Sequence, residues 1–232
     1  MPKVYLSPAY HWFNDCSIKG CDETTHNNLY MDELEPFLTA CGIEWKRGPR
    51  RVPKSNEDGT ALMHKAVKES NEWGADVHYV SHTNAFDGTV RGYRPIIYPG
   101  SEGGERLANY IIAERRKIYD QPIRLNTRDD LYETRVPNAV TYYEEHVFHD
   151  NIEDATWFHN NLREIARATC KGMCAYFGIP FVDPYDKPQA EGGNKLYRVQ
   201  VGAFRVRKNA DAYLKKVQAA GFPDAYITEA AL

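Results

Sequence analysis

The sequence has no apolar run near the ~20 residues that a membrane-spanning helix needs. Its first residues, MPKVYLSP, have neither the apolar core nor the cleavage site of a secretory signal peptide, so we expect synthesis in the cytoplasm. The net charge of −3 is small and gives no reason to expect a nucleic acid partner. Repeats and low-complexity segments are lacking as well. With 42% hydrophobic and 26% charged residues, the composition is that of an ordinary globular protein.

Cysteine is also scarce, with five residues in the whole chain. Such an odd and loosely spaced set does not indicate a disulfide framework. Cys16 and Cys21 could form a bridge or bind a metal, but a single C-x4-C pair is a weak signal. Cys170 and Cys174 lie one helical turn apart in an apolar helix, so we interpret them as small buried side chains.

Strand patterns alternate with helix patterns over residues 1–181, which we expect to form one domain. The predicted strands are residues 3–6, 43–45, 75–80, 92–98 and 138–148. The predicted helices are residues 26–41 (with a kink or break at Pro36), 60–73 (capped by Thr60), 105–119 and 150–177 (capped by Asp150 or Asn151). This alternation predicts an α/β fold with a mixed, largely parallel sheet flanked by helices.

The last fifty residues differ in character from this domain. Residues 182–194, VDPYDKPQAEGGN, contain two prolines and a glycine pair and are predicted to be a linker. Residues 195–232 predict a small β-α-β module, with strands at 196–204 and 225–228 around a helix at 208–221. The module is too short to bury much core alone, so it should pack on the body, a partner chain or a ligand. It carries seven basic and three acidic residues, whereas the rest of the chain is acidic, which indicates two separate tasks.

Polar side chains follow the predicted strands at the ends where open α/β sheets carry their sites. His11 follows the first strand, and His82 follows the buried strand that begins at residue 75. Two histidines and a carboxylate suit an open catalytic zinc site, whose fourth position is kept for water. Glu23, just before the first predicted helix, is placed to be the carboxylate. A further carboxylate, off the metal, would act as general base.

Spacing alone leaves alternatives open at each of these positions. His78 lies on the same strand face as His82, and a histidine in a strand is more often a hydrogen-bonded core residue than a ligand. Glu144 and Glu145 point to opposite faces of the late strand, so only one of them can face a given site. Glu23 by itself would be an ordinary acid at a helix N-terminus.

Four motifs, SPAYH, ETTHNN, SHTNAF and EEHVFHDN, decide between these alternatives by resemblance. In their order and content, residues 1–181 resemble the zinc-dependent N-acetylmuramoyl-L-alanine amidases of the amidase-3 type, found in bacterial autolysins and phage endolysins. The resemblance implies that His11, Glu23 and His82 hold Zn²⁺ and that Glu145 is the catalytic base. The H-x-N-A motif selects His82 over His78, and E-x-x-F selects Glu145 over Glu144. The family's usual D-P-G-H-G-G is SPAYHW here, without glycines.

By the same resemblance, Asn84 and Arg135 are candidates for orienting the metal ligands or the substrate. It implies a peptidoglycan hydrolase that cleaves the amide bond between N-acetylmuramic acid and the L-alanine of the stem peptide. The alternatives are a zinc carboxypeptidase or endopeptidase acting on the stem peptide, and a catalytically inactive wall-binding protein. Without a signal peptide, such an enzyme would reach the cell wall only after release from the cytoplasm.

The C-terminal segment resembles the start of a SPOR domain, a peptidoglycan-binding module, through the pattern YRVQVGAF, NA, AGF and AYI. A full SPOR domain is about twice this length and contains two β-α-β halves. We therefore expect a half-module that pairs with a second copy in a homodimer, or that docks on its own catalytic domain. Peptidoglycan is the expected partner, and neither nucleic acid binding nor membrane insertion is expected.

Overall fold

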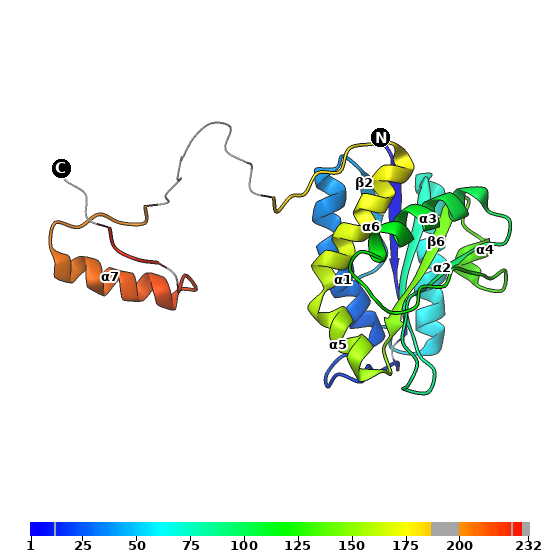
Figure 1. The fold of residues 1–232 in the computed structure, drawn as a ribbon, viewed down its shortest axis with the longest axis horizontal. Helices are drawn as coiled ribbons and strands as arrows, with labels where there is room; N and C mark the ends of the chain where they lie inside the picture. Colours follow the sequence, from blue (N-terminus) through cyan, green and yellow to red (C-terminus); the bar gives the residue numbers. More distant parts are fainter. Residues whose placement is uncertain (12, 187–199, 224, 229–232) are drawn as a thin grey trace. The chain divides into compact units, whose positions relative to one another are not determined.

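The computed structural model describes residues 1–11, 13–186, 200–223 and 225–228. It divides into two compact units, Met1–Lys187 and Pro188–Leu232, and each is described by itself. The larger unit is a sheet between two layers of helices (Figure 1). Among the described residues, no helix is both long enough and apolar enough to cross a membrane.

The sheet of the larger unit has six strands in the order β2-β1-β3-β6-β4-β5. Neighbours β2, β1, β3 and β6 are parallel, β4 is antiparallel to β6, and β5 is parallel to β4. The prediction of a mixed, largely parallel sheet is confirmed. The strands are β1 (Lys3–Pro8), β2 (Glu44–Arg47), β3 (Val77–Asn84), β4 (Arg94–Ile97), β5 (Asn126–Thr127) and β6 (Val140–Phe148).

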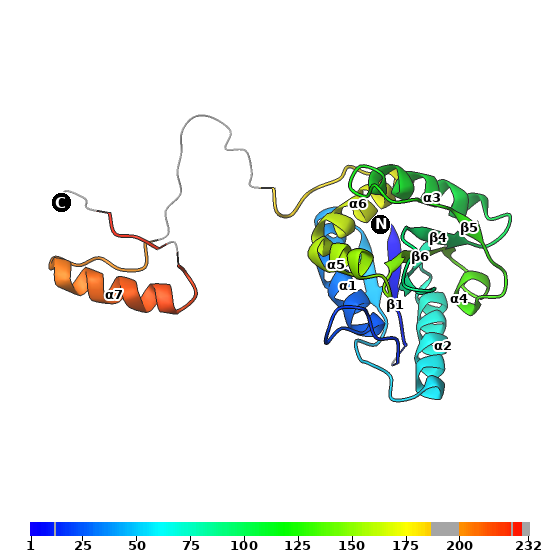
Figure 2. The ribbon, with the colours of Figure 1, turned by 60° about the horizontal axis from the view of Figure 1, so that its bottom comes forward.

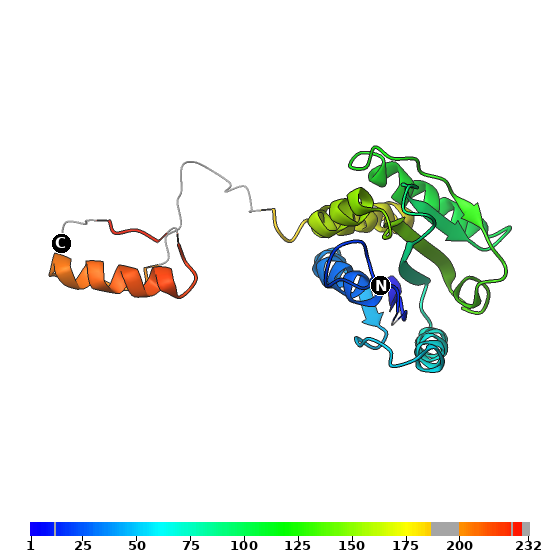
Figure 3. The same cartoon turned by 90° about the horizontal axis from the view of Figure 1, so that it is seen from below.

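Helices cover both faces of this sheet, as the turned views show (Figures 2 and 3). Helices α1, α3 and α6 pack together over one face, and α2 and α4 lie on the other. The helices of this unit are α1 (Glu23–Ala40), α2 (Asn56–Trp73), α3 (Glu102–Arg115), α4 (Tyr132–Arg135), α5 (Ile152–Asn160) and α6 (Leu162–Phe177).

The core beneath α1, α3 and α6 contains a buried charge as well as apolar side chains. Glu144 and Arg115 are both fully buried, with Arg115 Nη2 3.7 Å from Glu144 Oε2. The hydroxyls of Tyr79 and Tyr93 donate to the two Glu144 oxygens, and the Arg115 guanidinium lies over the Tyr93 ring. Arg115 also donates to His146 Nδ1 over 2.8 Å. These interactions offset the free-energy cost of burying the Glu144 carboxylate. Glu144 is therefore part of the core.

Several predicted element boundaries were wrong, each for a local reason. The predicted long helix is two helices, because Asn161 leaves helical geometry (φ −122°, ψ 16°) and its side-chain amide donates to the Trp157 carbonyl. Helix α1 runs on through Pro36 without a break. Helix α2 begins at residue 56, because Ser55 rather than Thr60 accepts a bond from a first-turn N–H. Helix α5 is capped by Asn151, one of the two caps predicted.

The described part of the smaller unit contains helix α7 (Arg207–Ala219), where a helix was predicted. The prediction of strands on both sides of this helix was wrong for the parts that the structure describes: residues 200–204 and 225–228 form no strand. A strand is stabilised by hydrogen bonds to a neighbouring strand, and the described residues of this unit supply none. No residue of α7 is buried. Among the residues of the unit that the structure describes, large hydrophobic side chains are exposed at Val201, Phe204, Val206, Tyr213, Phe222 and Tyr226.

The predicted linker is only partly described, since residues 187–194 lie outside the described residues. Its first residues contact the body. The Tyr185 ring packs edge-on against Phe37 with centroids 5.3 Å apart, and the Val182 N–H donates to Cys41 Sγ. Residues 182–186 therefore extend the packed surface of the larger unit.

Candidate metal centre

The site is built where three neighbouring parallel strands end. Because β1, β3 and β6 are adjacent, His11 after β1, His82 in β3 and Glu145 in β6 meet at one edge of the sheet. His82 and Glu145 are direct partners in the strand register. Glu23 is the first residue of α1. Its N–H donates to the Asn14 carbonyl over 2.8 Å, and this bond holds the start of α1 beside the segment that follows β1.

His11, Glu23 and His82 form one compact group. His11 Nδ1 lies 2.8 Å from Glu23 Oε2, and His82 Nδ1 lies 2.9 Å from Glu23 Oε1. In a tetrahedral site with Zn–N and Zn–O bonds of ~2.0–2.1 Å, neighbouring donor atoms are about 3.3 Å apart. A small outward shift would make room for a cation, and two imidazoles with a carboxylate are the donors of a catalytic zinc site that keeps one position open. The residues therefore fit Zn²⁺.

Neighbouring groups fix the Glu23 carboxylate in this position. The Thr83 backbone N–H donates to Oε1 over 3.0 Å, and the Asn14 side-chain amide donates to Oε2 over 2.7 Å. Burial would raise the pKa of Glu23, but its hydrogen bonds and charge interactions with His11 and His82 hold that pKa well below the ordinary value. The bond to Glu23 in turn raises the pKa of His11. The group thus holds an ionised carboxylate ready for a cation.

Among the described residues, no hydrogen-bond partner is found for the Glu145 carboxylate, which lies beside this group. The residue is partly buried, and its Oε2 is shielded from solvent without a hydrogen-bond partner among the described atoms. Burial first, and the charge of Glu23 second, raise the pKa of Glu145 well above the ordinary value, against the opposing charge of Arg128. An uncommitted carboxylate with a raised pKa is suited to accept and return a proton.

The structure separates the other sequence candidates from the group. His78 is fully buried deeper in β3, where its Nε2 lies 3.1 Å from Glu133 Oε1 and its ring stacks on Tyr5. Asn84 Oδ1 accepts from the Ala85 N–H and closes the turn after β3. Arg135 is exposed on α4. None of the described contacts joins Asn84 or Arg135 to the three clustered residues, so their roles stay predictions, as does metal binding by the cluster itself.

The residues that hold Glu23 were not found from the sequence. Asn14 lies in a loop without a motif, and Thr83 acts through its backbone N–H, which every non-proline residue possesses. Glu133, which binds Ser7 and His78 below the site, lies on helix α4. This helix is too short for a helical period to show in the sequence. Trp12, next to His11, lies outside the described residues.

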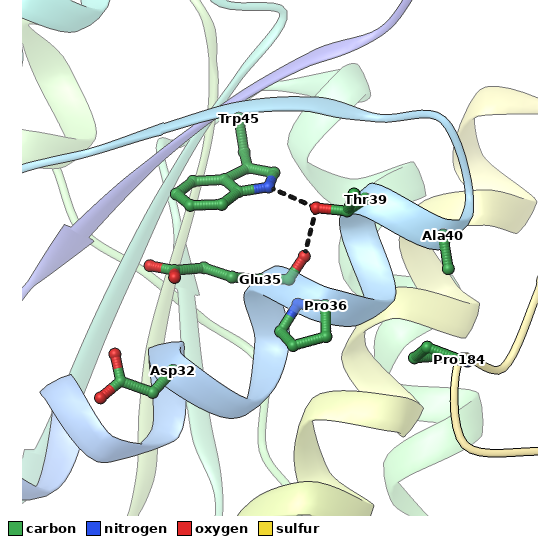
Figure 4. Close-up of a pocket in the computed structure, with 7 residues that line it drawn as sticks. All are labelled: Asp32, Glu35, Pro36, Thr39, Ala40, Trp45 and Pro184. Atoms are coloured by element: carbon green, nitrogen blue, oxygen red, sulfur yellow. Dashed lines mark hydrogen bonds between the residues drawn. The ribbon is translucent and has the colours of Figure 1, made fainter.

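A hollow of about 440 Å³ lies away from this site (Figure 4). It is formed by the C-terminal half of α1, where Glu35, Pro36 and Thr39 face Trp45 of β2. The Trp45 indole N–H donates to Thr39 Oγ1 over 2.9 Å. Because α1 begins at the metal group and runs away from it, this hollow is at the other end of the sheet and offers no histidine or cysteine.

Comparison with known proteins gives matches to both units. Residues 182–231 match the SPOR domain family. The N-acetylmuramoyl-L-alanine amidase CwlM of Bacillus licheniformis is 29% identical over 171 residues, which cover 71% of this chain and 62% of that protein. The sporulation-specific N-acetylmuramoyl-L-alanine amidase of Bacillus subtilis (strain 168) is 27% identical over 232 residues, which cover 96% of this chain and 83% of that protein.

Solved structures match the larger unit. The CwlD amidase from Clostridioides difficile, solved in complex with the GerS lipoprotein, has a TM-score of 0.69 at 18% identity and covers 77% of this chain and 99% of that one. The catalytic domain of the CD27L endolysin has a TM-score of 0.65 at 17% identity and covers 75% of this chain and 98% of that one. The comparisons confirm the resemblance: the body of the chain has the fold of the N-acetylmuramoyl-L-alanine amidases, and the segment that follows it matches the SPOR domain family.

Proposed function

We propose that the chain is a zinc-dependent N-acetylmuramoyl-L-alanine amidase, which hydrolyses the bond between N-acetylmuramic acid and the L-alanine of the stem peptide. The observation that carries the proposal is the uncommitted Glu145 carboxylate beside three clustered zinc-type donors. The relatives of the sequence and the neighbours of the fold are amidases of this name, which supports the same reaction.

The side chains of the site divide the chemistry between them. His11, Glu23 and His82 would hold Zn²⁺, which when bound supplies a Lewis acid for the scissile carbonyl and lowers the pKa of water. Glu145 accepts the proton of the attacking water and returns it to the leaving amine. Asn14 and Thr83 keep Glu23 aligned through their N–H groups. The half-exposed His11 leaves the group open to a large substrate.

Metal dependence is tested on the full chain with a matched pair of histidine variants. Dialysis against a chelator should remove activity toward purified peptidoglycan, and added Zn²⁺ should restore it. His82→Gln should lose both bound zinc and activity, whereas His78→Gln, which keeps a donor toward Glu133, should retain both. If the chelated enzyme or the His82→Gln variant stays active, the zinc mechanism is wrong. An inactive protein that still binds the wall would support the wall-binding alternative.

The C-terminal unit is proposed to hold the enzyme on peptidoglycan. Its match to the SPOR domain family supports wall binding, and its excess of basic residues suits an anionic wall. Action on the wall after release from the cytoplasm is part of the same proposal. Pairing of two C-terminal units stays a prediction. It would bury the exposed apolar side chains that the unit alone leaves in water.

A further inference from the structure

A second group of metal-type donors lies in the loop that leads to Glu23. Cys16 and Cys21 come from this loop, and His26 comes from the start of α1. Cys21 Sγ lies 2.8 Å from His26 Nδ1, Cys16 Sγ lies 3.6 Å from the same nitrogen, and the two sulfurs are 2.7 Å apart. All three donor atoms lie within 4.8 Å of one another. None of them is used by the proposed mechanism.

The second ring nitrogen of His26 is held as in a metal-bound histidine. His26 Nε2 lies 2.9 Å from His159 Nδ1 on α5, which packs beside this loop (Figure 1). A histidine ligand usually donates its other ring N–H to a fixed partner, which turns the remaining lone pair toward the metal. In the tautomer whose Nε2–H donates to His159 Nδ1, the His26 Nδ1 lone pair faces the two sulfurs. The Phe158 ring, edge-on to His26 at 5.6 Å, fixes the imidazole further.

We propose that Cys16, Cys21 and His26 form a second metal site, of the thiolate and imidazole class that takes Zn²⁺. Two thiolates and one imidazole are common in zinc sites, and the partly exposed Cys21 leaves the fourth position to water. On binding, both thiols release their protons to solvent and the thiolate lone pairs bind the cation. Zn–S bonds of ~2.3 Å place two tetrahedral sulfurs about 3.8 Å apart, so the two sulfurs must separate from their present 2.7 Å. The inference does not depend on the amidase activity.

The position of this site gives it a structural role. Cys16 N–H donates to the Cys21 carbonyl over 2.9 Å, and the Ser17 N–H donates to the His149 carbonyl over 2.8 Å. The same loop carries Asn14, and it ends at Glu23. A cation joining the two cysteines to α1 would therefore fix the segment that presents both Glu23 and its hydrogen-bond donor.

The test counts metal and identifies its ligands in the full chain. After removal of metal and reloading with Zn²⁺, the wild type should bind two equivalents, Cys21→Ser one, and His82→Gln one. With Co²⁺, the wild type should show near-ultraviolet thiolate-to-cobalt charge transfer, which a site of histidine and glutamate cannot produce. Cys21→Ser should lose this absorption. Cys41→Ser, in the separate group of Cys41, Cys170 and Cys174, is the matched control and should keep it.

Alkylation of the wild type avoids reliance on a folded variant. Metal should protect Cys16 and Cys21 from an alkylating reagent, and a chelator should expose both. One zinc equivalent without charge transfer would overturn the proposal. So would charge transfer that survives Cys21→Ser but is lost in Cys41→Ser. A Cys16–Cys21 disulfide in the metal-loaded protein, detected by mass analysis without reduction, would also overturn it.

Discussion

Replacing Glu145 with Gln should stop catalysis and at the same time stabilise the metal-free protein. Glu145 Oε2 is shielded from solvent and has no hydrogen-bond partner among the described residues, and burial raises the pKa of this carboxyl. Because the folded pKa lies above the unfolded value of about 4.3, stability is full below that pH and is lost as the pH rises through the folded pKa. At pH 8 the wild type therefore bears a cost that the neutral amide of Gln avoids.

The size of this effect follows from the buried charge, because the Gln amide keeps an unpaired polar atom at this position but is neutral. Burying a group without partners costs more when it is charged than when it is neutral, and we take the difference as about 1–3 kcal/mol of unfolding free energy. In a unit of this size each kcal/mol moves Tm by about 2–4 °C, so Glu145→Gln should raise Tm by about 2–12 °C at pH 8. Loss of a general base lowers turnover by about 10²–10⁴-fold.

The neighbouring Glu144 provides the matched control. It pairs with the buried Arg115, so Glu144→Gln leaves that cation uncompensated and should cost about 3–5 kcal/mol, lowering Tm. Molecules of this variant that stay folded should keep their activity. The assay compares calorimetric Tm of the chelated proteins at pH 6 and 8 with peptidoglycan cleavage by the zinc-loaded ones. A fall in Tm for Glu145→Gln, or retained activity, refutes the reasoning.

Three further predictions concern the metal group and the C-terminal unit. Asn14→Ala removes one hydrogen-bond donor to Glu23 and should weaken zinc binding about 10–100-fold, measured by chelator competition. An unchanged zinc affinity would argue against a role for Asn14 in aligning Glu23. Zinc affinity should also fall as the pH drops through the neutral range, because Glu23 raises the pKa of His11 and protons compete with the metal; a flat profile contradicts this. The full chain should have the mass of a dimer by light scattering, and Phe204→Ser should return it to a monomer. A monomeric wild type defeats the pairing prediction.

The sequence alone predicted the central strands of the sheet and the candidate site residues at their ends. Apolar runs placed β1 and β3, and β6 was predicted as a long strand. The adjacency of parallel strand ends brought His11, His82 and Glu145 to one edge. The choice of His82 over His78 did not come from periodicity, since both lie on one face. It needed the resemblance, and the buried bond of His78 to Glu133 agrees with that choice.

Other features depend on contacts that no local pattern records. The break at Asn161 depends on one side-chain bond inside a continuous helical pattern. Strand β5 and helix α4 are too short to show a period. The C-terminal strands were expected from alternation, but a strand requires a neighbour that local sequence does not provide.

Mass analysis of peptidoglycan fragments tests the central claim most directly. Digestion by the zinc-loaded full chain should yield stem peptides with a new free L-alanine amine and glycan strands with unsubstituted muramic acid. Glu145→Gln and the chelated wild type should yield neither product. Cleavage further along the stem peptide, with L-alanine still joined to the glycan, would contradict the account.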